Sequence, residues 1–110
     1  MTVVAGYHVP FMASVTATTA PQAIGTLISA VYPSIPLRAM YIQIQLDTTA
    51  GGTSLYIGNA NVSATNCGAN LSANQANQQY AFDRNLIVLN DLWILASTGT
   101  AQVNLIVVVG

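Results

Sequence analysis

Formal charge is scarce in this 110-residue chain, and that scarcity limits the surfaces that its fold can present to water. Only five residues are charged, two arginines and three aspartates, and there is no lysine. An ordinary soluble domain has about 25% charged residues. At the same time 53% of the residues are apolar, yet no apolar run approaches the roughly 20 residues of a membrane-spanning helix. The composition therefore predicts a domain that buries much of its outside against other protein, as an assembly component does.

The charge balance and the cysteine count argue against several classes of function. The net charge is −1, so the basic stripe of a nucleic-acid-binding protein is missing, and no basic amphipathic helix suggests a membrane surface. Cys67 is the only cysteine, which rules out an internal disulfide and, without companion ligands, a structural zinc site. Residues 1–6 lack the features of a signal peptide. We expect one domain made in a cytoplasm, with no cofactor and with neither nucleic acid nor membrane as a partner.

Two-residue alternation of apolar and polar side chains runs through the middle and end of the chain. Between residues 40 and 47, Ile42 and Ile44 fall on one face, while Gln43 and Gln45 fall on the other, as in a half-buried strand. The pattern predicts an all-β fold, a single antiparallel β-sandwich or flattened barrel. The predicted strands are Val15–Thr19, Ala39–Leu46, Thr53–Gly58, Gln79–Asp83, Leu92–Ser97 and Val103–Val109. The predicted core residues are Ile42, Ile44, Leu55, Ile57, Phe82, Ile94, Leu105 and Val107.

Turn residues predict how two of these strands connect. Gly51 and Gly52 lie in a turn cluster, and glycine readily takes the positive φ that tight turns need. We therefore predict that the strands at 39–46 and 53–58 pair as a hairpin. The segment Asn59–Gln78 is rich in Asn, Ala, Ser and Gln and is predicted to be a long loop.

The last two predicted strands, 92–97 and 103–109, are apolar on both faces. In the final strand Leu105 and Val107 share one side, while Ile106 and Val108 lie on the other beside Asn104. Antiparallel sheets usually keep one solvated face. The second apolar face is therefore either covered by a loop of the same chain or in contact with another subunit, and the sequence favours neither.

The N-terminal third has mixed signals. Thr19 and Gln22 have the spacing of a capping box, apolar residues then recur at helical intervals, and Pro33 would stop a helix near Tyr32. We predict one short helix near Pro21–Tyr32. Residues 1–13 are predicted to be a first strand or an arm that reaches a neighbour, and residues 14–110 to form the β-sandwich domain.

Residues capable of catalysis are few and scattered. A nucleophilic triad needs a histidine held by a carboxylate beside a serine or cysteine. The only histidine, His8, lies in the least structured part of the chain, and Cys67 lies in the predicted loop. Asp83 is adjacent to Arg84, and Asp91 precedes a strand at a turn, where Asp commonly bonds backbone amides. We expect structural roles for all of them, and no enzyme.

Two aromatic residues are candidates for recognition. Asn-rich loops occur in sugar-binding sandwiches, and the ring of Trp93 or Tyr56 could stack on a sugar. The simpler interpretation of Trp93 is an anchor in the core or at an interface. Trp93, Tyr56, Ile106 and Val108 are the predicted interface residues.

The segment from Ser54 onward resembles small structural proteins of tailed-phage virions. Their pattern is a strand ending in "YIG" or "YVG", an "NVTA" or "DVTA" stretch and an "NG…L" loop, and this chain has SLYIGNANVSATN at 54–66, followed by Gly68 and Leu71. LNDLWILAS at 89–97 is similar to the family's "LDDL…L(Y/W)…AS" before a closing valine-rich strand. Where the family usually has a Gly-Glu pair before the next strand, this chain has Asn74–Gln79. The similarity covers most of the chain after Ser14.

This resemblance implies a non-enzymatic virion protein without cofactors. Such proteins are compact β-sandwiches or barrels that sit on capsids as cement or decoration proteins, or act as minor neck or tail components. The expected function is a capsid cement protein that bridges major capsid subunits. The alternative is a carbohydrate-binding or other minor tail or neck component. The expected partners are the major capsid protein or other virion proteins and further copies of this chain, as a homotrimer or else a dimer. The expected location is the capsid surface, after synthesis in the host cytoplasm.

Overall fold

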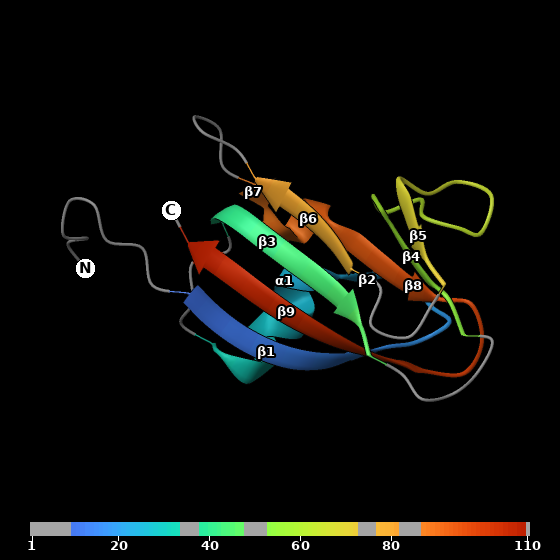
Figure 1. Ribbon diagram of the computed structural model, residues 1–110, viewed down its shortest axis with the longest axis horizontal. Coiled ribbons are helices and arrows are strands. Elements are labelled where there is room, and N and C mark those ends of the chain that lie inside the picture. The colour runs from blue at the N-terminus through green and yellow to red at the C-terminus, as the bar shows by residue number, and fades with distance from the viewer. Residues whose placement is uncertain (1–9, 34–37, 48–52, 73–76, 82–86, 110) are drawn as a thin grey trace, which may run out of the picture.

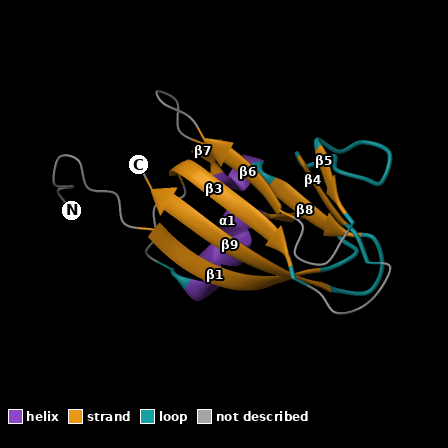
Figure 2. Ribbon diagram, viewed as in Figure 1, coloured by secondary structure: helices purple, strands orange, loops and turns teal. Residues whose placement is uncertain are grey.

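The computed structural model describes residues 10–33, 38–47, 53–72, 77–81 and 87–109 (Figure 1). The elements are β1 Pro10–Ala17, β2 Gln22–Ala23, α1 Ile24–Val31, β3 Arg38–Leu46, β4 Leu55–Gly58, β5 Ala69–Leu71, β6 Asn77–Ala81, β7 Ile87–Val88, the 3₁₀ turn η1 Leu89–Asp91, β8 Trp93–Ala96 and β9 Ala101–Val109. One sheet has the order β1-β9-β3-β6, with β7 also paired to β3, and the other has the order β2-β8-β4-β5. Every strand pair is antiparallel, and strands dominate the molecule (Figure 2).

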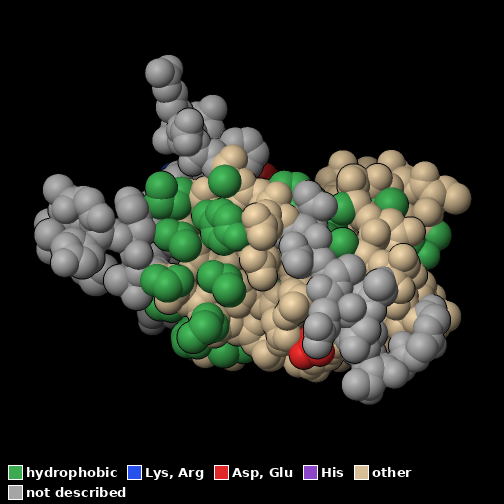
Figure 3. Space-filling model, viewed as in Figure 1, with side chains coloured by type: hydrophobic (Ala, Val, Ile, Leu, Met, Phe, Trp, Pro, Cys, Tyr) green, Lys and Arg blue, Asp and Glu red, His purple; other side chains and the backbone are tan. Residues whose placement is uncertain are grey.

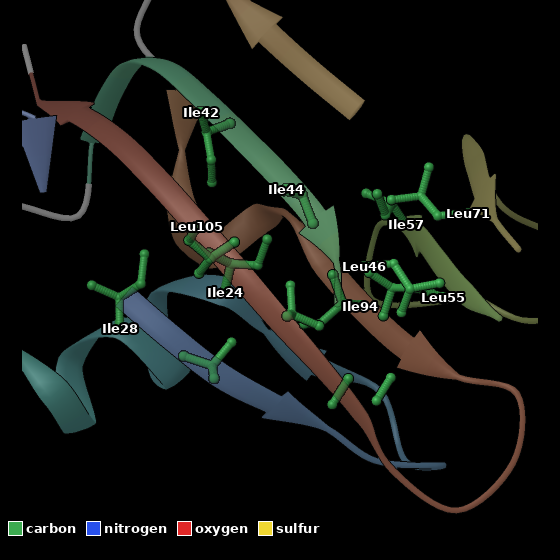
Figure 4. Packing of buried hydrophobic residues seen from close by; sticks show 14 of the residues in the cluster. Ile24, Ile28, Ile42, Ile44, Leu46, Leu55, Ile57, Leu71, Ile94 and Leu105 are labelled. Atoms are coloured by element: carbon green, nitrogen blue, oxygen red, sulfur yellow. The ribbon is translucent and has the colours of Figure 1, made fainter. Parts of the chain in front are cut away.

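The two sheets share one apolar core, as predicted for an all-β sandwich. Alternate residues of β3, β4, β8 and β9 point into it, together with side chains from α1 (Figure 4). Seven of the predicted core residues are at most 1% exposed: Ile42, Ile44, Leu55, Ile57, Ile94, Leu105 and Val107. The eighth, Phe82, lies outside the described residues. The two-residue period therefore identified the core correctly.

The predicted helix is present as α1, but it does not begin with a capping box. Its N-cap is Ala23, which makes no side-chain hydrogen bond to the helix, and Gln22 belongs to β2. The backbone N–H of Ile24 instead donates to the carbonyl of Leu92 at 2.8 Å, so a neighbouring segment satisfies this donor. Ile24 and Ile28 are buried, and α1 lies behind β1 and β9 in Figure 1. Tertiary contacts, rather than local capping, position the helix.

The first strand begins earlier than predicted. β1 runs from Pro10 to Ala17, whereas the prediction began at Val15, so the strand crosses the boundary drawn between residues 13 and 14. Its full length pairs with β9, from Pro10 opposite Val108 to Ala17 opposite Ala101. The hydroxyl of Tyr32, just after α1, donates to the carbonyl of Met12 at 2.8 Å. Residues 10–13 thus form a strand, one of the two alternatives predicted for residues 1–13, and its partners are far along the chain.

The predicted hairpin between the strands at 39–46 and 53–58 is wrong. β3 pairs with β9, β6 and β7, while β4 lies in the other sheet between β8 and β5. The chain therefore changes sheets between Asp47 and Thr53. Alternation shows which face of a strand is buried but not which strand is its partner, and β9 offers β3 a far longer partner than the four-residue β4 does.

The segment predicted as one long loop contains ordered structure. β5, at Ala69–Leu71, pairs with β4, and β6 begins at Asn77. An isolated bridge joins Ser63 to Asn66, and the side chain of Asn59 accepts a hydrogen bond from the backbone N–H of Asn61 at 2.9 Å. A three-residue strand is too short to show a period, so its polar composition suggested a loop.

Gly99 is expected to be sensitive to substitution although it is exposed. It lies in the turn from β8 to β9 with φ of +55°, and a Cβ built there would meet no atom within 4 Å. Any loss of stability on substitution of Gly99 is therefore due to backbone conformation and not to a steric clash. We expect Gly99→Ala to lower the free energy of unfolding by about 1–2 kcal/mol and Gly99→Asn by less, because asparagine tolerates this region. Urea unfolding of both variants measures the change in the free energy of unfolding. Equal losses of stability in Gly99→Ala and Gly99→Asn would contradict the explanation by backbone conformation.

Ionisation of Tyr80 should make the free energy of unfolding depend on pH in the alkaline range. Tyr80 lies on β6 opposite Ile42 and packs against the core. Burial raises the pKa of Tyr80 above its usual value of 10.0. As pH rises, the unfolded chain therefore loses this proton before the folded chain does. This contribution to the free energy of unfolding is fully present below about pH 10 and is lost as pH rises through the folded-state pKa. Urea unfolding at a series of pH values should show this decline in the free energy of unfolding, and the decline should be smaller in Tyr80→Phe. An equally large decline in Tyr80→Phe would contradict its assignment to Tyr80.

Candidate interaction surfaces

The four predicted interface residues divide between two separate surfaces. Ile106 and Val108 lie on β9 in the first sheet, whereas Tyr56 lies on β4 and Trp93 on β8 in the second. All four are partly exposed, while their strand neighbours Leu105, Val107, Ile57 and Ile94 are buried in the shared core. Each pair therefore belongs to the outer face of its own sheet. The structure does not bring the four together.

We call the outer face of the first sheet the sheet-one face. Its residues form rows across the strands, given by the pairing register. Pro10, Val108, Tyr41 and Ala81 form the first row; Met12, Ile106, Gln43 and Gln79 form the second; Ser14, Asn104 and Gln45 form the third; Thr16 and Gln102 form the fourth. The first row is apolar apart from one hydroxyl, the second is half apolar, and the others are polar. Arg38 at the start of β3 and Asp47 just after its end are the charged residues that the structure describes at the two ends of this face.

The apolar end of this face is open to solvent. Met12 is 70% exposed, the largest value among the exposed large apolar residues of the described chain. In Figure 3 hydrophobic side chains gather over one end of β1, β9 and β3, and polar side chains cover the rest of these strands. A contiguous apolar area on a small soluble domain usually marks an interaction site.

The polar part of the sheet-one face is already internally hydrogen-bonded. Gln79 Nε2 donates to Gln43 Oε1 at 3.1 Å, and the hydroxyl of Tyr41 donates to the same oxygen at 3.3 Å. Asn104 Nδ2 donates to Gln45 Oε1 at 3.3 Å and to Asp47 Oδ2 at 2.8 Å. The Ser14 hydroxyl donates to Asn104 Oδ1 at 2.8 Å. Apart from the Tyr41–Gln43 bond within β3, these bonds link neighbouring segments of the sheet, so the side chains form a network in the plane of the face.

The outer face of the second sheet, here the sheet-two face, carries the two aromatic candidates. Tyr56 is opposite Leu95 on one side and Asn70 on the other, and Trp93 is opposite Gly58. Tyr56 and Trp93 are thus diagonal neighbours on adjacent strands. The indole Nε1 of Trp93 donates to the carbonyl of Asn90 at 3.0 Å, which fixes the ring while it stays partly exposed.

The loop from Asn59 to Gly68 folds back on the sheet-two face. A Cβ placed on Gly58 would lie 3.2 Å from Val62 Cγ2, and Val62 is only 4% exposed. The backbone N–H of Gly68 donates to the carbonyl of Ile57 at 2.7 Å, which closes the loop against β4. The loop therefore forms an ordered, uncharged border beside Trp93 and Tyr56.

The described residues contain no arrangement suited to catalysis or metal binding. No group of three or more His, Cys, Asp or Glu side chains lies close enough to hold a metal ion in the described part of the chain. Cys67 is exposed in the loop, and Asp91 is exposed in η1. His8, Asp83 and Arg84 lie outside the described residues. No helix of the described ranges is both long and apolar enough to cross a membrane.

Sequence reasoning missed most of the sheet-one face. The prediction for residues 1–13, which include Met12, left a first strand and an arm open, and the side of the third strand that carries Gln43 was interpreted only as its polar side. A signal for β1 was present, since Phe11, Ala13 and Val15 alternate with Met12 and Ser14. The rows themselves depend on the pairing of β1 with β9 and of β9 with β3, which a single sequence does not reveal.

Comparison with protein-family models, with curated proteins and with solved structures gave no match. The resemblance to tailed-phage virion proteins therefore depends on the motifs at 54–71 and 89–97 alone. The structure places the first motif on β4, the loop after it and β5, and the second on η1 and β8. Both motifs thus contribute to the second sheet.

Proposed function

We propose that this chain is a non-enzymatic structural protein of a virus particle, a cement or decoration protein on the capsid surface. The observation that carries the proposal is the presence of two outer sheet faces with few charges on one small domain; among the described residues the charged ones on the first face are Arg38 and Asp47, near its two ends. The motif resemblance supports the choice of a tailed-phage particle. The protein is made in the host cytoplasm and joins the particle during assembly.

The proposed mechanism is bridging. A domain with two contact faces can bind two proteins at once, and many weak contacts on a lattice add up to strong attachment. Uncharged amide and hydroxyl side chains can be buried at such contacts without the large desolvation penalty of charged groups. Trp93 and Tyr56 give one face the aromatic side chains that are enriched at protein interfaces.

Immunolabelling of purified particles tests this proposal. Particles from the organism that encodes the chain are labelled with an antibody against it and viewed by electron microscopy. Label distributed over the heads is the expected result. Label confined to the neck or tail would replace the cement role by a minor tail or neck component. Particles without label that are shown to lack the chain by mass spectrometry would overturn the proposal.

Carbohydrate binding is the second candidate, because Tyr56 and Trp93 share one face. Two partly exposed aromatic rings on adjacent strands, with Asn70 beside them, are the kind of platform on which sugar rings stack. Glycan-array binding tests this function. A signal lost in both Trp93→Ala and Tyr56→Ala, but kept in Ile106→Ala on the opposite sheet, would favour a host-recognition component. Absence of any signal from the folded wild type would remove this candidate.

A further inference from the structure

We propose that Gly25 is a positioning residue for Trp93. A glycine at position 25 lets η1 lie against the first turn of α1, where the carbonyl of Asn90 holds the indole ring of Trp93. Trp93 is the only tryptophan in the chain and lies on the sheet-two face. The orientation of its ring follows from contacts within the chain, whereas the effect on binding rests on the proposed function, in which this face contacts coat subunits.

The strand neighbours of Trp93 give its ring little lateral support. In the register of the second sheet, Trp93 is opposite Ala23 on β2 and opposite Gly58 on β4. Residues directly opposite each other lie on the same face of a sheet, so the indole is flanked in its row by a methyl group and by a residue without a side chain. Neither neighbour is large enough to select one rotamer of the indole, so its orientation depends on a contact from outside this row.

That contact comes from η1. The indole Nε1 of Trp93 donates to the carbonyl of Asn90 at 3.0 Å. Leu89, at the start of η1, is fully buried, and its carbonyl accepts the backbone N–H of Leu92 at 3.4 Å. A single hydrogen bond contributes little net stability, so the place of η1 decides whether the carbonyl of Asn90 stays within reach of the indole.

α1 sets the place of η1 through two contacts. The backbone N–H of Ile24 donates to the carbonyl of Leu92 at 2.8 Å. A Cβ built on buried Gly25 would collide with the side chain of Asn90 and lie 3.0 Å from its backbone nitrogen. The side chain of Asn90 is exposed and can rotate away, but its backbone nitrogen moves only together with η1. A side chain at position 25 would therefore push η1 away from α1, together with the carbonyl that holds the indole.

A ring that is held in one orientation before binding loses less conformational freedom when a partner covers it. Ordering a side chain during binding lowers the affinity, and tryptophan is among the residues that dominate protein interfaces. Gly25 is buried, so it does not touch a partner. Under the proposed function, Gly25 therefore raises the affinity for coat subunits only through the ring of Trp93.

The indole N–H tests the contact directly, because a chain with one tryptophan gives one indole resonance in a ¹H–¹⁵N spectrum. In Gly25→Ala we expect this resonance to move upfield and its exchange with solvent to quicken by roughly 2- to 10-fold, the factor that one such hydrogen bond contributes. Gly99→Ala is the matched control, since its Cβ lies in the turn from β8 to β9 and meets no atom within 4 Å. An unchanged indole N–H in Gly25→Ala, or an equal change in both variants, would overturn the proposal.

Asn90→Ala provides a partial rescue. It removes the side-chain part of the collision, keeps the carbonyl that accepts from the indole, and leaves the contact of the Cβ with the backbone nitrogen. The exchange rate should be highest in Gly25→Ala, intermediate in the double variant and lowest in Asn90→Ala. The comparison of the last two proteins decides the question even where Gly25→Ala alone does not fold. A double variant that exchanges as slowly as Asn90→Ala, or as fast as Gly25→Ala, would overturn the proposal.

Cosedimentation with capsids assembled without this chain separates the role of Gly25 from the function on which its effect on binding rests. Gly25→Ala should bind with about 2- to 10-fold lower affinity than the wild type, and Gly99→Ala with the same affinity. A wild type that does not bind would defeat the capsid function, while the indole N–H would still decide whether Gly25 positions Trp93. Equal binding of wild type and Gly25→Ala, with a shifted indole resonance, would overturn the link between ring orientation and affinity.

Discussion

Replacing Leu105 by alanine should lower the free energy of unfolding by about 2–5 kcal/mol. Leu105 is 1% exposed on β9, the strand between β1 and β3. Ala13 and Ile44 are its partners in the register, and Figure 4 shows it within the core cluster that includes Ile24. Truncation removes three carbons from a site enclosed by two sheets and a helix. The surrounding elements cannot collapse into the space without breaking their own pairing, so a cavity remains. Urea unfolding measures this loss of stability, provided that the dependence of the free energy of unfolding on urea concentration is the same in both proteins.

The matched control is the next residue on the same strand. Ile106→Ala removes a side chain of the same size from the partly exposed outer face. Measured at a concentration where the protein is monomeric, it should cost less than about 1 kcal/mol, because little apolar area returns to water. Equal losses for Leu105→Ala and Ile106→Ala would contradict the assignment of the two faces of β9.

Replacing Gly25 by alanine should destabilise the protein by about 1–2 kcal/mol, although alanine is the better helix former. Gly25 is buried in the first turn of α1, and a Cβ built there would collide with the side-chain oxygen of Asn90 and lie 3.0 Å from its backbone nitrogen. Alanine gains about 1 kcal/mol in helix propensity, whereas overpacking a close contact costs about 1–3 kcal/mol. The backbone of η1 limits how far the contact can relax, so we expect the steric cost to dominate.

A double-mutant cycle separates these two effects. Asn90→Ala removes the colliding side chain but keeps the backbone carbonyl that accepts the hydrogen bond from Trp93. Gly25→Ala should therefore cost less in the Asn90→Ala background than in the wild type, with a coupling energy of about 0.5–3 kcal/mol. A Gly25→Ala protein that is as stable as the wild type would show that α1 and η1 are not in close contact.

The fold was predictable where the signal is local. Alternation at Ile42 and Ile44 placed β3 and its buried face correctly, because one buried face per strand imposes a period of two. The helix was located by the spacing of Ile24 and Ile28. Its capping was not, because the donor of Ile24 bonds to Leu92, a residue far along the chain.

The pairing of strands was not predictable from local pattern. Gly51 and Gly52 suggested a hairpin, yet β3 and β4 belong to different sheets. The candidate interaction surfaces could not be predicted in full for the same reason, because they depend on strand pairing. Ile106 and Val108 were recognisable as a second apolar face, but the two rows that join Ile106 to Met12 and Val108 to Tyr41 exist only through the long-range register of β1, β9 and β3. A single sequence specifies which residues face outwards more readily than which of them become neighbours.

Cosedimentation with capsids assembled without this chain tests the central claim most directly. The purified chain is added to such particles at low and at high salt, and the bound fraction is measured after pelleting. The account predicts saturable binding that changes little with salt, because contacts between uncharged side chains such as Trp93 and Tyr56 are not screened. Trp93→Ala should weaken binding at both salt concentrations. Failure of the folded wild-type chain to bind, or binding that disappears at high salt, would contradict the account.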